Sequence, residues 1–212
     1  MTNACCLLLF FALSPVDAVI SRLEQHYNRL EALQALFVQI YRADENSAPR
    51  EESGTVYLKK PGRMRWEYTR PESKLFISDG KMVYFYAPAD RQVTRTPVKE
   101  SSDLRTPLRF LLGKMNLKRI FARIEMATDL APLDPGNAVL RALPKPQGEN
   151  FRQMYLEVDQ QSRLRRLVIY EADGSRSEFR LSGEQANPPL DTALFRFVIP
   201  AGVEVVDERS GP

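Results

Sequence analysis

The sequence predicts a mainly β protein with some α-helix, built around one large curved antiparallel sheet or barrel of about eleven strands. Three observations favour this fold class. After the first helical stretch, apolar and polar residues alternate with a period of two, as in half-buried strands. Turn residues interrupt the alternation, and two Asp-Gly pairs between alternating runs are hairpin signals. The length of 212 residues suits one sizeable domain rather than two.

The first segment has the features of a targeting sequence. Residues 4–13 form an apolar run that is too short to span a membrane and suits a signal peptide. Val16 and Ala18 stand at the positions that cleavage after Ala18 requires, although no lysine or arginine precedes the run. We therefore expect a signal peptide over 1–18 and one domain over 19–212; the alternative is a buried N-terminal helix.

The two cysteines, Cys5 and Cys6, lie in this first segment. Cleavage would remove both and leave an exported chain without thiols, which needs no disulfide. They precede or open the apolar run, whereas a bacterial lipoprotein carries its modified cysteine after it. We therefore expect a free protein without a lipid anchor.

A helical pattern begins at Asp17. Apolar residues recur every three or four positions, at Ile20, Leu23, Tyr27 and Leu30. This spacing predicts one amphipathic helix that ends near residue 34. The "SRLE" stretch at 21–24 would serve as a capping box if the helix started late.

The alternating runs that follow predict the strands. These runs are 36–43, 53–60, 63–69, 74–79, 82–87, 91–96, 119–128, 137–143, 151–159, 163–172, 175–182 and 194–199. A second helical stretch, "SSDLRTPLRFLLGK", interrupts them with an apolar stripe of Leu104, Leu108, Leu111 and Leu112. Pro107 should split it into two short helices, and Gly113 should end it. Because the stripe must be buried, we expect it to pack on the sheet.

Composition and motifs give no sign of catalysis. The net charge of +3 comes from interleaved acids and bases, so no basic groove for nucleic acid is indicated. The single histidine, His26, lies among polar neighbours on the first helix. No phosphate-binding or nucleophile motif occurs. We expect no catalytic residues, metal site or cofactor.

The stretch "KKPGRMRWEY" at 59–68 lines one side of a strand with Met64, Trp66 and Tyr68. In the next hairpin, a two-residue Asp79-Gly80 loop would pair Ile77 with Met82 and Leu75 with Tyr84. One face would then carry Leu75, Ile77, Met82, Tyr84 and Tyr86, and the other Phe76, Val83 and Phe85. Both faces are apolar, so the pattern leaves open whether either is core or a surface that meets a partner.

The chain resembles the family of periplasmic outer-membrane lipoprotein carrier proteins, LolA. The densest resemblance is "GTVYLKKPGRMRWEYTRPESKLFISDGKMVYFYAPADRQV" at 54–93. It has the family's order of a Gly-led strand ending in two basic residues and proline, an aromatic strand with tryptophan, a strand running into Asp-Gly, and a closing Gln-Val. "TPLRFLLG" at 106–113 matches the family's short helical insert, and "FRFVIPAGVEVVD" at 195–207 matches its terminal strand and tail.

The resemblance implies an unclosed β-barrel with a lid of short helices over the concave face and lipoprotein acyl chains bound between them. It implies acylated lipoproteins as cargo, an inner-membrane ABC transporter that loads them, and an outer-membrane receptor that takes them. We expect a monomer in the periplasm. The expected lipid-binding residues are Leu23, Tyr27, Leu30, Met64, Trp66, Tyr68, Leu75, Ile77, Met82, Tyr84, Tyr86, Leu104, Leu108 and Leu111.

One position departs from the family pattern. The family often has arginine as the second basic residue before the proline, where it ties the lid to the barrel, and this chain has Lys60. Lysine cannot make a planar forked contact to several carbonyl groups, so a lid clasp at Lys60 would be looser. The alternatives on the same half-barrel are a periplasmic lipid-binding protein and an envelope-stress sensor domain. A hydrolase would need a nucleophile and base that the sequence does not offer.

Overall fold

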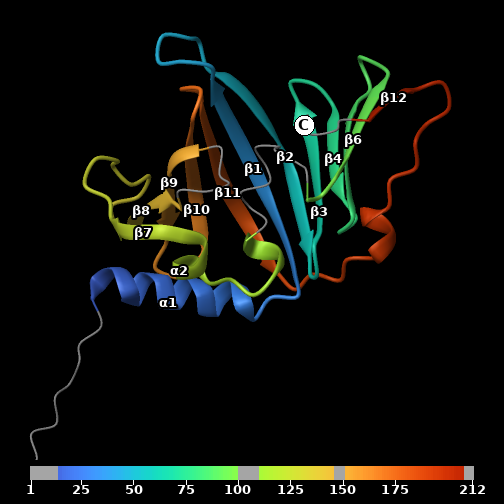
Figure 1. Ribbon diagram of the computed structural model, residues 1–212. Helices are drawn as coiled ribbons and strands as arrows, with labels where there is room; N and C mark the ends of the chain where they lie inside the picture. The colour runs from blue at the N-terminus through green and yellow to red at the C-terminus, as the bar shows by residue number, and fades with distance from the viewer. Residues whose placement is uncertain (1–13, 100–109, 146–150, 208–212) are drawn as a thin grey trace, which may run out of the picture.

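The computed structural model describes residues 14–99, 110–145 and 151–207 as twelve strands in one sheet with short helices at one end (Figure 1). The helices are α1 (Pro15–Asn28), α2 (Leu117–Ile120) and the 3-10 helix η2 (Thr192–Phe195). The strands are β1 (Ala32–Arg42), β2 (Arg50–Lys59), β3 (Arg63–Arg70), β4 (Lys74–Ser78), β5 (Met82–Ala87), β6 (Gln92–Pro97), β7 (Phe121–Met126), β8 (Ala138–Pro144), β9 (Phe151–Val158), β10 (Leu164–Glu171), β11 (Arg176–Ala186) and β12 (Glu204–Asp207).

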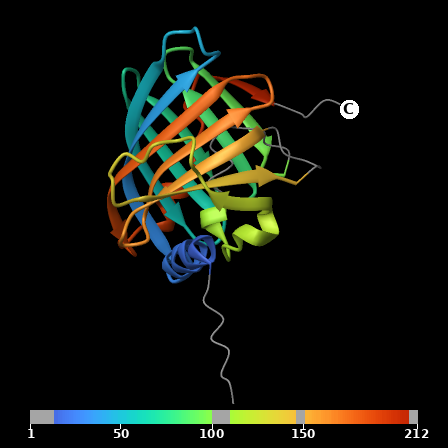
Figure 2. The same ribbon diagram turned by 90° about the vertical axis from the view of Figure 1, so that its left-hand side faces the viewer.

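The sheet is a barrel that does not close. Its strand order is β12-β6-β5-β4-β3-β2-β1-β11-β10-β9-β8-β7, so β12 and β7 form the two edges. The sheet curves so strongly that its two halves face each other, as the turned view shows (Figure 2). Neighbouring strands are antiparallel, except that β12 pairs parallel with β6. The predicted fold class, an unclosed β-barrel with helices, is confirmed.

Helix α1 begins earlier and ends earlier than its periodicity predicts. The side chain of Ser14 caps it by accepting a hydrogen bond from the N–H of Asp17, and Pro15 follows at the first helical position. Ser21 therefore lies inside the helix, not at a capping box. The helix stops at Asn28 because the alternation of β1 already starts at Ala32, four residues ahead of the predicted strand.

The loop of the β4–β5 hairpin lies one residue away from its predicted position, but the two faces of the hairpin are as predicted. The loop is Gly80-Lys81 rather than Asp79-Gly80, because Asp79 donates its N–H to the carbonyl of Met82 and Gly80 adopts a φ of +96°. Ile77 consequently pairs with Tyr84 instead of Met82. The loop moved by one residue, so each pairing moved by two, and every side chain kept its predicted face.

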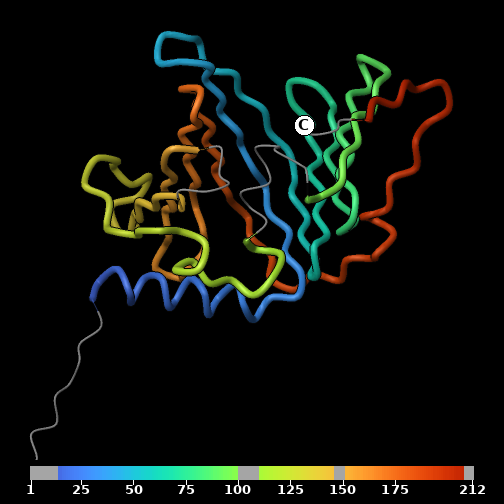
Figure 3. The backbone as a smooth tube through the Cα atoms, in the orientation of Figure 1, coloured from blue at the N-terminus to red at the C-terminus, as the bar shows by residue number. Residues whose placement is uncertain are grey.

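The predicted terminal strand at 194–199 is wrong. Residues Thr192–Phe195 form a 3-10 helix instead, capped by Asp191, and the final strand is β12 further along the chain. The apolar residues that suggested a strand there, such as Phe195 and Phe197, pack across strands of the sheet rather than joining its ladder. In the tube view this segment runs along the side of β6 before β12 (Figure 3).

The second helical stretch is described only from residue 110. Residues 110–112 form one turn of 3-10 helix that ends before Gly113, and α2 follows, which the sequence did not predict. Leu111 and Leu112 are buried in the main core, as a stripe packed on the sheet requires. Leu104, Pro107 and Leu108 lie outside the described residues. We call α1 together with residues 110–120 the lid.

Candidate functional site

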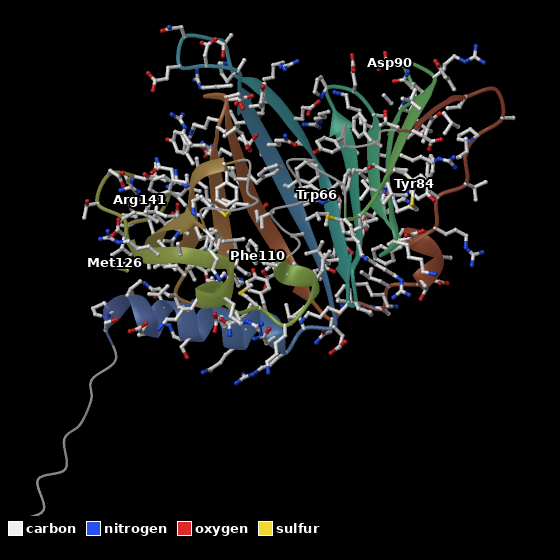
Figure 4. All side chains as sticks on the ribbon, in the orientation of Figure 1. Trp66, Tyr84, Asp90, Phe110, Met126 and Arg141 are labelled. Carbon is white, nitrogen blue, oxygen red and sulfur yellow. The ribbon has the colours of Figure 1, made fainter. Side chains whose placement is uncertain are left out.

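The inner face of the barrel, the face that carries Trp66, is mostly apolar around that residue. Strand pairing places Met64 beside Leu58 and Trp66 beside Val56, and paired residues share a face. All four belong to the main core cluster, and Trp66 is completely buried. Met64, Trp66 and Tyr68 therefore share one side of β3, as the alternation predicted, and that side points into the barrel (Figure 4).

Aromatic rings fill the middle of this interior. The ring of Phe37 on β1 meets Trp66 at 4.7 Å and Tyr68 at 4.9 Å between centroids, and Phe179 on β11 meets Trp66 at 5.5 Å. The contacts are edge-to-face, the arrangement that aromatic pairs prefer. The Tyr68 hydroxyl donates to Gln39 Oε1 at 2.6 Å, so its polar end is satisfied. In this state side chains occupy the space at the centre of the barrel.

Phe37 and Phe179 were missed as site residues. Each lies in an alternating run that the sequence identified as a strand, but periodicity alone does not say which strands face each other across a curved sheet. The signal that would have found them is the pairing of β1 with β11, which joins residues far apart in the chain.

The lid closes the lower end of the barrel through the apolar side of α1 (Figure 1). Leu23, Tyr27 and Leu30, three of the predicted lipid-binding residues, are buried there in the same cluster as Trp66. Leu111 reaches this cluster from the other part of the lid. The structure therefore brings these four residues together with Met64, Trp66 and Tyr68.

Lys60 ties the end of α1 to the barrel. Its Nζ donates a hydrogen bond of 2.8 Å to the carbonyl of Tyr27, in the last turn of the helix, and its own N–H donates to the carbonyl of Glu31. Partial burial lowers the pKa of Lys60, with Glu31 opposing that shift. The ammonium group thus makes one hydrogen bond to the lid, without the planar fork of an arginine.

A small pocket opens at this tie. It lies where the end of α1, the start of β1 and the end of β2 meet, and its walls are mostly apolar. The lining residues are Tyr27, Leu30, Glu31, Ala32, Leu33, Leu58, Lys60 and Leu111. The pocket marks the seam along which the lid and the barrel would part.

Tyr27 is the second polar tie of the lid. Its hydroxyl donates to Glu184 Oε2 at 2.8 Å and accepts the N–H of Leu164 at 2.9 Å, linking α1 to β11 and β10. Burial and the nearby Glu184 carboxylate raise the pKa of Tyr27 well above its usual range. His26 Nε2 lies 2.7 Å from the other oxygen of Glu184, so the lone histidine has a structural partner.

The lid is also held together by its own parts. Asn28 exchanges two hydrogen bonds with the backbone of Met115, and Glu24 accepts the N–H of Leu117. Asp17 forms an ion pair with Lys118, and that contact lowers the pKa of Asp17. These contacts join α1 to residues 115–118, so both parts of the lid would move as a unit.

Five more of the predicted lipid-binding residues lie on the outer face, while Leu104 and Leu108 fall outside the described residues. The side chains of Leu75, Ile77, Met82, Tyr84 and Tyr86 point away from Trp66, because Phe76 pairs directly with it. Phe197 covers this outer side, with its ring 5.4 Å from Tyr84 and 5.7 Å from Tyr86. Figure 4 shows Tyr84 on the far side of the strands from Trp66. The inner face of the hairpin carries Phe76, Val83 and Phe85 instead.

Among the residues that the structure describes, no group of three or more His, Cys, Asp or Glu side chains is arranged to hold a metal ion. Within the same residues, no helix has both the length and the apolar character that a membrane crossing needs. The described features of the site are its apolar interior and the polar contacts between the lid and the barrel.

An unclosed barrel with a mostly apolar inner face and a helical lid defines a class of protein that can enclose hydrocarbon. The comparisons specify the family: the model of the outer membrane lipoprotein carrier protein LolA matches residues 28–198. The chain belongs to this family.

Relatives and a solved structure agree with that assignment. The chain is 30% identical to the outer-membrane lipoprotein carrier protein of Serratia proteamaculans, over 97% of each chain. It is also 30% identical to the protein of that name from Methylococcus capsulatus, over 89% of this chain and 88% of that one. The crystal structure of an uncharacterized conserved protein from Thermus thermophilus superposes with a TM-score of 0.55 at 17% identity, covering 92% and 100% of the two chains; it supports the fold alone.

Proposed function

We propose that this protein is a carrier that shields the acyl chains of lipoproteins and delivers them to the outer membrane. The observation that carries the proposal is the inner face: buried aromatic and aliphatic side chains on β1, β2, β3 and β11 lie beneath a lid with few polar ties. The relatives at 30% identity are named for this function.

The energetics of the cargo fit such an interior. Each buried methylene is worth about 0.8 kcal/mol, so one sixteen-carbon chain exposes about 12 kcal/mol of unfavourable surface in water. An acylated lipoprotein therefore needs an apolar enclosure to cross an aqueous compartment. Met64, Trp66 and Tyr68 suit adaptable binding, because methionine is flexible and the two aromatic residues are amphipathic.

Loading requires the lid to part from the barrel. The centre of the barrel is filled by Phe37, Trp66 and Phe179, so acyl chains must displace the lid, the rings or both. The ties at Lys60 and Tyr27 set the free energy of that opening. We infer that Lys60 acts as a gating residue whose single hydrogen bond holds the empty state closed.

The proposed partners and location follow from this role. An inner-membrane ABC transporter would load the carrier and an outer-membrane receptor would unload it, in the periplasm. Residues 1–18 would then be a signal peptide. Cleavage after Ala18 would remove Ser14 and Asp17, and with them the helix cap and the ion pair to Lys118. The mass of the exported protein tests the cleavage site directly.

Native mass spectrometry of the exported protein, purified without detergent, tests the proposed function. We expect a fraction to carry a triacylated lipoprotein and the empty remainder to bind added triacylated peptide. A bound free lipid with no affinity for the peptide would replace the proposal with a lipid carrier. An empty protein that refuses the peptide would refute it.

A matched pair of variants identifies the binding face. Phe110, half-buried against the core at the lid, is replaced by Gln; Leu36, which is 54% exposed on the outer face, is replaced by Gln as a control. Binding of the triacylated peptide should weaken at least fivefold in Phe110→Gln and stay unchanged in Leu36→Gln. The reverse order would place the acyl chains outside the barrel.

A further inference from the structure

A polar patch interrupts the inner face at the end of the barrel away from α1. Glu171 is the last residue of β10, and the turn that follows lies at the upper end in Figure 1, opposite the lid. Its side chain shares the inner face with Ile169, two residues earlier, and with its pairing partner Phe151; both belong to the main core. Only 9% of Glu171 is exposed.

Ser177 on β11 lies on the same face. It pairs with Ile169 on one side and Tyr41 on the other, and it is completely buried. Glu171 is bonded through its backbone to Ser175, two residues before Ser177. The two side chains are therefore diagonal neighbours on adjacent strands, about 7 Å apart, a gap that the long glutamate side chain can bridge.

One buried polar atom in each side chain lacks a hydrogen-bond partner among the described residues. Glu171 Oε1 and Ser177 Oγ have no hydrogen bond within the part of the chain that the structure describes. A buried polar atom without a partner is costly and uncommon in native proteins, and such atoms often mark sites that a ligand completes. Glu157 Oε2 on the outer face also lacks a hydrogen bond within these residues, but Glu157 is paired there with a base, Arg166, at 2.7 Å, and its Oε1 accepts from Leu133 and Asn137.

The protonation state of the Glu171 carboxyl group decides whether it can donate a hydrogen bond. Burial raises the pKa of Glu171 to about 7, and the negative charge of Asp173 adds to the shift. Arg152, the nearby base, donates its Nε hydrogen to the Glu171 carbonyl rather than to the carboxyl group. A protonated carboxyl donates one hydrogen bond, as does a serine hydroxyl. When the Glu171 carboxyl group is protonated, the pair thus offers two donors in an apolar wall.

We propose that Glu171 and Ser177 form a subsite that donates hydrogen bonds to the ester or amide carbonyl oxygens of bound acyl chains. The inference deepens the proposed function and rests on it. The linkage groups of the cargo would lie at the end of the barrel away from α1, with the hydrocarbon running toward Trp66. The subsite would fix which end of the amphiphile enters, a choice that an apolar wall alone cannot make.

The test compares two ligands of equal chain length. One is a cysteinyl peptide with two ester-linked chains and one amide-linked chain; the other replaces both esters by ethers and keeps the amide. The wild type should bind the ester peptide about fivefold to tenfold more tightly, since ethers are weaker acceptors. Glu171→Leu and Ser177→Ala should each reduce this preference. Glu171→Gln should retain most of it, because an amide still donates.

Two further readouts separate the outcomes. The infrared stretching band of carbon-13-labelled ester carbonyls should lie at lower frequency in the wild type than in Glu171→Leu. Ser182→Ala, on the opposite face of β11, should change neither band nor affinity. Tight binding of both peptides with no preference in any variant would overturn the subsite and leave the carrier function standing. Failure of the wild type to bind either peptide would overturn both.

Discussion

Gly54 shows how one residue sets the spacing of two strands. It lies on β2 beside Tyr68 on β3, and a Cβ atom there would come within 1.8 Å of the Glu67 carbonyl oxygen. The rings of Phe37 and Tyr68, which pair with Gly54 from both sides, meet over this gap. Only glycine permits so close an approach of the two backbones.

We therefore expect Gly54→Ala to lower the free energy of unfolding by about 1–3 kcal/mol, because the strands must separate to admit the methyl group. Urea denaturation measures the change. Gly113→Ala serves as the matched control, since a Cβ there meets nothing within 4 Å. Equal stability of Gly54→Ala and Gly113→Ala would contradict the close approach of the backbones.

Glu171 should make stability depend on pH. The unfolded chain has the ordinary pKa of 4.5, whereas burial raises the pKa of the folded state to about 7. Between pH 4.5 and about 7 the folded state binds more protons than the unfolded state, so the free energy of unfolding falls as the pH rises. The stabilisation from Glu171 is therefore full below about pH 4.5 and is lost as the pH rises through about 7. The full loss should be about 3 kcal/mol, because one unit of pKa shift corresponds to about 1.4 kcal/mol.

Glu171→Gln removes this titration. We expect the wild type to lose more unfolding free energy than Glu171→Gln between pH 5 and pH 8, as measured by urea denaturation at both values. Other groups titrate equally in the two proteins, so the difference isolates Glu171. Identical pH dependence of wild type and variant would show that Glu171 titrates normally.

At the scale of elements, two of the polar contacts between the lid and the barrel are unlike each other. Lys60 makes one partly buried hydrogen bond to the last turn of α1, and the Tyr27 hydroxyl makes a buried one to β10 and a partly buried one to β11. Removing a buried hydroxyl leaves its partners unsatisfied, whereas removing a lysine at the edge leaves a carbonyl that water can reach. Tyr27→Phe should therefore lower the stability of the fold, whereas Lys60→Ala should leave the fold stable.

Tyr27→Phe should destabilise the protein by about 1–3 kcal/mol, because the Leu164 N–H and the Glu184 carboxylate lose a partner. Hydrogen exchange of α1 and residues 115–118 should accelerate in step with the loss. Unchanged exchange in the lid would mean that Tyr27 does not hold it closed.

Lys60→Ala should leave the fold stable and change release of cargo more than uptake. Lys60→Arg is the informative companion, since its forked donor can reach further carbonyl groups and should slow opening. Rates of transfer of a fluorescent triacylated peptide into and out of the carrier measure both steps. Equal loss of uptake and release in Lys60→Ala would argue against a clasp at this position.

At the scale of the whole molecule, the empty carrier is filled by its own side chains. Trp66 and the rings around it occupy the centre, and the barrel has an open seam between β12 and β7. Packed interiors admit no extra volume without movement. Loading must therefore widen the molecule along the lid or along the seam.

We expect the radius of gyration from small-angle scattering to increase on binding of a triacylated peptide. Exchange should rise in the lid while β1, β2 and β11 stay protected, because these central strands have partners on both sides. Loading without expansion, and with unchanged exchange in the lid, would show that acyl chains bind outside the filled interior.

The sequence by itself determined the class of fold and much of the inner face. Alternation placed Met64, Trp66 and Tyr68 on one side of β3, and helical spacing placed Leu23 and Tyr27 on the buried side of α1. These patterns are local, because a strand has a period of two and a helix of 3.6. They do not depend on what the rest of the chain does.

The tertiary structure decided which apolar faces meet. Both faces of the hairpin at 74–87 are apolar, and the pairing of Phe76 with Trp66 in the curved sheet put the face with Tyr84 outside, where Phe197 covers it. Residues 194–199 do not form a strand of the sheet, because their aromatic side chains pack over other strands.

The polar contacts could not be predicted from the sequence either. The contact of Lys60 with Tyr27 and the placement of Glu171 and Ser177 on adjacent strands depend on strand order and curvature. No local period encodes these. Periodicity fixes the side on which a residue lies, and only the folded chain fixes what stands opposite.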